Sequence, residues 1–123
     1  MASKQELEAE RSLRLLFPDL QREVTIDKII PSKTNSGIRV DIWVPSIRLV
    51  VEIHGIQHHK PSGFGSDKIT TKQKFIDQIS RDSRLMNLCN QYNINYEQID
   101  YNQKSDFASI FRQFGKYCEE NND

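Results

Sequence analysis

An α/β fold, a three-layer sandwich with a mixed central sheet, is predicted by the order of hydrophobic patterns along the 123 residues. Segments with helical periodicity lie near both ends of the chain and in its middle. Short runs rich in Val and Ile lie between them and are typical of strands. Strands that alternate with helices in this way pack between them. The predicted order is α-β-β-β-α-β-α, in a single domain spanning 1–123.

Three amphipathic helices are expected. The first spans residues 5–17, and it ends there because Pro18 disfavours a helical conformation at the residue before it. The second spans about 67–91 and the third about 106–119, each with apolar residues at helical spacing. These helices supply the two outer layers of the sandwich.

Four strands are expected to form the central layer, at 21–30, 38–44, 48–54 and about 94–99. A short turn at Pro45 separates the second strand from the third, so these two are predicted to pair as a hairpin. The third strand is a nearly continuous apolar run, which is typical of a central strand covered on both faces.

Composition limits the classes of function. The 17 basic and 17 acidic residues cancel, which counts against a strong non-specific nucleic-acid binder without excluding a nuclease. Cys89 and Cys118 lie far apart and are expected to be ordinary thiols. No apolar run approaches the ~20 residues that cross a bilayer, and no hydrophobic leader follows Met1. An intracellular, cytoplasmic protein that does not enter membranes is therefore expected.

Polar residues interrupt the two central strands. Asp41 lies inside the second strand, and Glu52 and His54 interrupt the most apolar strand of the chain. Because strand side chains alternate between faces, Glu52 and His54 point the same way, and the hairpin brings Asp41 beside them. A pairing of Asp41 with Arg39, and a structural role for the histidine, are the ordinary alternatives. Three such residues on adjacent central strands favour a functional site.

A divalent cation would compensate the buried charge. Mg²⁺ prefers carboxylates and water as ligands, and it lowers the pKa of a bound water that can attack a phosphodiester. His54 is suited to act as general base, because the unperturbed pKa of histidine lies near neutral pH. The sequence therefore predicts a Mg²⁺ site, in which Mn²⁺ can substitute.

The spacing of these residues resembles that of a nuclease family. Asp41, followed after ten residues by Glu-Ile-His at 52–54, resembles the PD-(D/E)xK signature of restriction-endonuclease-like nucleases, with His in the place of Lys. The Gly after His54 and the pair His58 and His59 resemble the very-short-patch-repair endonucleases and the EDxHD homing endonucleases. The resemblance implies a restriction-endonuclease-like sandwich and metal-dependent hydrolysis of DNA, by nicking or double-strand cleavage.

The resemblance also assigns roles to residues. Glu10 matches the family's glutamate on the first helix, Asp41 its principal metal ligand and His54 its base. In one register Glu52 is a direct metal ligand. In the other, the metal is bound by the backbone carbonyl of Ile53, and Glu52 is not a direct ligand but lies within one water of the ion.

Two positions stay open. The family's helical aspartate is matched by Asp82, which follows Arg81, and Asp77 is a near rival. His58 is expected to touch phosphate or the leaving group. A zinc site that combines it with His54 is the alternative, and it is disfavoured because Gly55 breaks the strand between them.

Basic residues follow the active strand and are expected to contact DNA phosphates, although a solvated helix face would explain them as well. They are Lys60, Lys72, Lys74, Arg81 and Arg84. DNA is thus the expected partner, with a homodimer or a fused DNA-recognition domain left open. The alternatives to a homing or repair nuclease are a junction-specific or structure-specific recombination nuclease and a non-catalytic nucleic-acid-binding module on the same fold.

Overall fold

The computed structural model describes residues 4–30, 37–54, 68–100 and 102–120. The strands are β1 (Gln21–Thr25), β2 (Arg39–Val44), β3 (Leu49–His54) and β4 (Asn95–Asp100). The helices are α1 (Lys4–Leu16), α2 (Ile26–Ile29), α3 (Lys68–Gln91) and α4 (Phe107–Glu120), with a 3-10 turn η1 (Pro45–Ile47) between β2 and β3. The predicted α/β class is confirmed.

The four strands form one sheet in the order β1-β2-β3-β4. The first three pair antiparallel and β4 joins β3 in parallel, so the sheet is mixed, as predicted. The expected hairpin of β2 and β3 is confirmed, with η1 turning the chain between them. β3 has a partner on each side, and its residues Leu49, Val50 and Val51 are fully buried.

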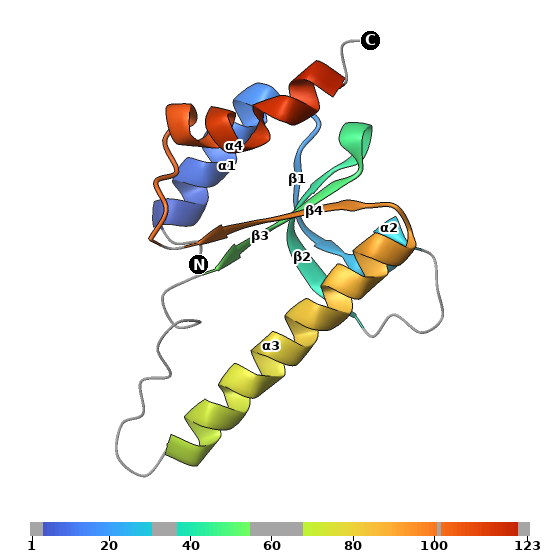
Figure 1. Ribbon diagram of the computed structural model, residues 1–123, viewed down its shortest axis with the longest axis vertical. Coiled ribbons are helices and arrows are strands. Elements are labelled where there is room, and N and C mark those ends of the chain that lie inside the picture. The colour runs from blue at the N-terminus through green and yellow to red at the C-terminus, as the bar shows by residue number, and fades with distance from the viewer. Residues whose placement is uncertain (1–3, 31–36, 55–67, 101, 121–123) are drawn as a thin grey trace.

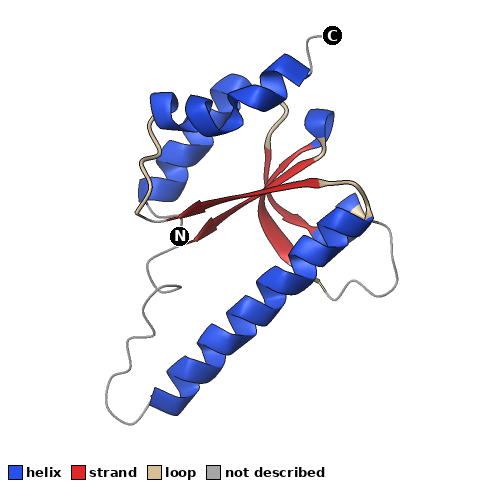
Figure 2. Cartoon of the chain, in the orientation of Figure 1, coloured by secondary structure: helices blue, strands red, loops and turns tan. Residues whose placement is uncertain are grey.

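Helices cover both faces of the sheet (Figures 1 and 2). On one face, Leu13 of α1 and Phe114 of α4 belong to a core cluster with Val51 of β3. On the other face, Leu85 of α3 belongs to a second cluster with Val50. Neighbouring residues of β3 thus enter opposite cores, as strand alternation requires.

The predicted strand 21–30 is wrong beyond Thr25. The chain turns there into α2, in which the amide of Ile30 donates to the carbonyl of Ile26 at 2.8 Å. Both isoleucines are buried in the core cluster that includes α3 residues, and Ile29 packs against the same cluster. Residues three and four apart share one face of a helical turn, whereas a strand would turn Ile29 to the other face. The helical turn places all three side chains against this core.

The C-terminal part of α3 packs on the sheet, whereas its N-terminal part extends past the sheet edge (Figure 1). Leu85 and Cys89 are fully buried, while Ile76 and Ile79 are 47% and 51% exposed. Arg81 and Asp82 therefore lie where the helix reaches the sheet.

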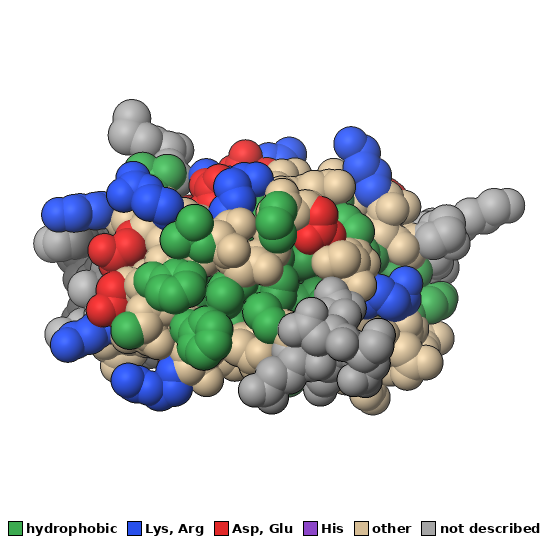
Figure 3. Space-filling model, turned by 90° about the horizontal axis from the view of Figure 1, so that it is seen from above, with side chains coloured by type: hydrophobic (Ala, Val, Ile, Leu, Met, Phe, Trp, Pro, Cys, Tyr) green, Lys and Arg blue, Asp and Glu red, His purple; other side chains and the backbone are tan. Residues whose placement is uncertain are grey.

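The side of the molecule that carries α4 and α1 exposes apolar side chains, which gather in the middle of this face (Figure 3). The exposed ones on the two helices are Leu7, Leu15, Phe107 and Phe111. They belong to amphipathic helices. Among the described residues, no helix is long and apolar enough to cross a membrane.

Candidate active site

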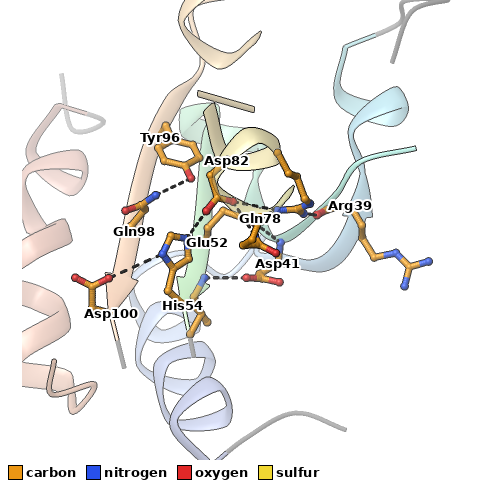
Figure 4. Close-up of polar contacts among 11 residues, drawn as sticks. Arg39, Asp41, Glu52, His54, Gln78, Asp82, Tyr96, Gln98 and Asp100 are labelled. Atoms are coloured by element: carbon orange, nitrogen blue, oxygen red, sulfur yellow. Dashed lines mark hydrogen bonds and ion pairs between the residues drawn. The ribbon is translucent and has the colours of Figure 1, made fainter. Parts of the chain in front are cut away.

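Asp41 and Glu52 meet where β2 and β3 stop pairing as a regular ladder (Figure 4). The backbone register of the two strands runs from Val44 opposite Leu49 to Ile42 opposite Val51. Beyond it, side chains supply the hydrogen bonds. The amide of Asp41 donates to Glu52 Oε2 at 2.9 Å, and the amide of Ile53 donates to Asp41 Oδ2 at 2.8 Å.

The alternation of β2 changes at Asp41. Val40 and Trp43 pack in the same core cluster although they are three residues apart, and Ile42 packs in the opposite one. In a regular strand, residues three apart would face opposite sides. On the adjacent strand, Glu23 adopts a left-handed conformation with φ of 52°. Such conformations are uncommon outside glycine and gather at functional sites.

Burial acts on both carboxylates, and the charge of Asp41 acts on Glu52. Glu52 is 2% exposed, and its pKa is raised to about 7 by burial and then by the charge of Asp41. Burial also raises the pKa of Asp41, although the hydrogen bond from the Ile53 amide and the charges of Arg81 and His54 oppose the rise. Burial thus disfavours the charged form of both carboxylates, and either a proton or a cation relieves this cost.

Arg81 brings a positive charge from α3 to these carboxylates. Its Nη1 lies 3.0 Å from Glu52 Oε1 and 3.3 Å from Asp82 Oδ1, and its Nη2 donates to the backbone carbonyl of Arg39. The guanidinium is placed by the helix, because Leu85, one turn further on, is anchored in the core.

His54, the last residue of β3, lies between two aspartates (Figure 4). Its Nε2 is 3.6 Å from Asp82 Oδ2, and its Nδ1 is 4.0 Å from Asp100 Oδ1. The imidazole side chain is 12% exposed. The two carboxylates lie on opposite sides of the ring, where they can hold its orientation.

Four of the predicted catalytic residues thus come together: Asp41, Glu52, His54 and Asp82. The rival aspartate on α3 does not share these contacts. Asp77 is exposed and accepts a hydrogen bond from Gln73 Nε2 at 2.9 Å on its own helix. Of the two helical aspartates, Asp82 is the one that approaches His54.

Glu10 is linked to this region through an arginine. Its carboxylate accepts from Arg22 at 3.2 Å and from Arg14 at 2.7 Å. Arg22 lies on β1 opposite Ile42, and its charge opposes the rise in the pKa of Asp41. Glu10 therefore reaches the site as a partner of Arg22.

β4 supplies residues that the sequence interpretation missed. Tyr96, Gln98 and Asp100 alternate along the strand, and the parallel register sets Gln98 opposite Glu52 and Asp100 opposite His54. Gln98 Nε2 donates to the Tyr96 hydroxyl at 3.0 Å. The signal in the sequence was the alternation of these polar residues. It could be interpreted only once β4 was known to run parallel to β3.

The predicted DNA-binding residues have different environments. Lys72 and Arg84 are exposed on α3, whereas Arg81 lies within the carboxylate cluster. His58 and Lys60, and the side chain of Lys74, lie outside the described part of the chain.

The predicted metal ligands offer oxygen atoms. Asp41 and Glu52 present carboxylates, and the Ile53 peptide adjoins both. Within the described residues, no group of three or more His, Cys, Asp or Glu side chains has an arrangement that could hold a metal ion. The two carboxylates are oxygen donors of the kind that a hard cation such as Mg²⁺ prefers.

A scan against models of protein families, a search of curated proteins and a search of solved structures each found no match to this chain.

Proposed function

We propose that this chain is a metal-dependent endonuclease that hydrolyses phosphodiester bonds of DNA on a restriction-endonuclease-like sandwich, inside the cell. The observation that carries the proposal is the contact of Asp41 with the buried Glu52, in which each carboxylate accepts a hydrogen bond from the other's strand. A structural pair of this kind is costly unless a positive charge compensates it.

Asp41 and Glu52 would hold Mg²⁺ or Mn²⁺, with Glu52 bound directly or through one water. The bound ion supplies an activated water and polarises the scissile phosphate. Oxygen ligands favour Mg²⁺ and Mn²⁺ over Zn²⁺, and the buried thiol of Cys89 belongs to the core cluster rather than to this pair.

His54 is assigned the role of general base. It ends the strand that carries Glu52, so its imidazole lies on the same face of the sheet. Asp82 and Asp100 would orient the ring as it takes the proton. Exposed Lys72 and Arg84 are proposed to contact the DNA backbone, because a long, positively charged side chain on a helix can reach phosphates.

The test is nicking of supercoiled plasmid by the purified full chain. Nicking is expected with Mg²⁺ or Mn²⁺ and is expected to stop with EDTA, while Zn²⁺ is not required. Asp41→Asn, purified in the same way, controls for contaminating nuclease. Cleavage that survives exhaustive EDTA treatment, or that is equal in Asp41→Asn, would exclude this mechanism.

A further inference from the structure

The guanidinium of Arg81 occupies a central place among the acidic groups of the site. It contacts Glu52 at 3.0 Å and Asp82 at 3.3 Å. Its second terminal nitrogen donates to the backbone carbonyl of Arg39, so the group is fixed at both ends. The side chain is 26% exposed, and its partner Glu52 is nearly fully buried.

A solvated cation on a helix surface would not show this arrangement. An exposed ion pair contributes little, because water competes for both partners. Here the acidic partner lies in the core, and removing the cation would leave a buried charge without compensation. Arg84, one turn of α3 away, is exposed and gives the contrast on the same helix.

We propose that Arg81 is the internal counter-ion of the Asp41–Glu52 pair, which it holds assembled in the metal-free chain, and that it competes with a divalent cation for Glu52. It is thus a positioning residue that sets the metal affinity. The inference rests on the proposed function, since it takes the pair to be the metal site.

The competition follows from electrostatics. A divalent cation that binds Glu52 would lie within a few ångströms of the guanidinium, at a distance where like charges repel strongly even at the effective dielectric of a protein site. Binding must therefore either overcome this repulsion or displace Arg81 from Glu52. Removal of the guanidinium should tighten divalent binding by about tenfold or more.

The experiment measures Mn²⁺ binding to the full chain by titration calorimetry, and thermal unfolding in the presence of a chelator. Arg81→Gln is compared with Arg84→Gln, which makes the same change of charge on the same helix. Arg81→Gln is expected to lower the Tm of the metal-free chain and to tighten Mn²⁺ binding. Arg84→Gln is expected to leave the Tm close to wild type and the dissociation constant within about twofold.

Two further variants keep the test decisive. Arg81→Lys keeps the charge, so its Mn²⁺ affinity should stay within about threefold of wild type. In a Glu52→Gln background, Arg81→Gln should cost much less in Tm than it does in the wild-type chain, because the buried charge is gone. This background also serves where Arg81→Gln alone does not fold.

The outcomes separate this inference from the function it rests on. If the wild-type chain binds Mn²⁺ and Arg81→Gln binds it no more tightly, the counter-ion role is overturned and the metal site stands. Equal losses of Tm for Arg81→Gln in both backgrounds would overturn it as well. If no form of the chain binds Mn²⁺, both the inference and the metal-dependent function fail.

Discussion

The backbone amide of Asp41 donates to the carboxylate of Glu52 at 2.9 Å, across two antiparallel strands. The carboxylate of Asp41 in turn accepts from the amide of Ile53, the residue after Glu52. Each acid thus replaces a backbone group that a regular ladder would supply. Both side chains are thereby fixed before any ligand arrives, which is what a preorganised site requires.

Asp41→Asn is expected to abolish cleavage while stabilising the fold. The amide oxygen of Asn can still accept from Ile53, and the substitution removes the charge that repels Glu52. We expect a gain of about 1 kcal/mol in the free energy of unfolding, or roughly 4 °C in Tm. Plasmid nicking and calorimetry check the two effects. A variant that is inactive because it is strongly destabilised would assign Asp41 a structural role.

His54→Ala is expected to slow cleavage by roughly 10²–10⁴-fold, the usual contribution of a general acid or base. The metal should bind as before, because the carboxylates that we assign to it are untouched. Single-turnover cleavage at saturating Mn²⁺, together with titration calorimetry, measures both properties. Loss of Mn²⁺ binding with a normal rate per bound ion would instead make His54 a ligand.

Asp82→Asn and Asp77→Asn form a matched pair on α3. Asp82 lies 3.6 Å from His54 Nε2, whereas Asp77 is exposed and contacts Gln73. Asp82→Asn should reduce cleavage by about tenfold to a hundredfold, because His54 loses the carboxylate that aligns its ring. Asp77→Asn should cleave within about twofold of wild type. The reverse ranking in a cleavage assay would show that the wrong aspartate was chosen.

The stability of the metal-free chain should fall as pH rises. The pKa of Glu52 is raised from 4.5 to about 7, by burial and then by Asp41. Between these values the native state binds the proton more tightly than the unfolded chain does. The stabilisation that comes from protonated Glu52 is therefore fully present below about pH 4.5 and is lost as pH rises through about 7.

A shift of this size corresponds to about 3 kcal/mol in the free energy of unfolding. Urea unfolding with chelator at about pH 5 and about pH 8 measures it, and Glu52→Gln should flatten the difference. The raised pKa of Asp41 acts in the same direction. An unchanged pH dependence in Glu52→Gln would place the responsible group elsewhere.

The sequence by itself determined the hairpin of β2 and β3 and which polar side chains lie together on one of its faces. Alternation in the apolar run of β3 placed Glu52 and His54 together, and the short turn at Pro45 brought Asp41 beside them. These relations depend on residues close in sequence, and local periodicity and turn chemistry are enough to set them.

Local periodicity could not distinguish a strand from a helical turn where the two patterns coincide over a few residues. The stretch after Thr25 has apolar residues that fit both strand alternation and a helical turn. The tertiary structure chose the turn, because Ile29 packs against the same core as Ile26 and Ile30. A helical turn puts all three on one face, whereas strand alternation would put Ile29 on the opposite face.

Only the tertiary structure decided which groups of α3 and β4 complete the site. The sequence favoured Asp82 and left Asp77 as a near rival on the same helix, and the packing of Leu85 against the sheet turned Asp82 toward His54. The parallel pairing of β4 with β3 brought Asp100 to the same imidazole. Contacts between elements far apart in sequence depend on how the helix and the strand dock, and no local pattern encodes that geometry.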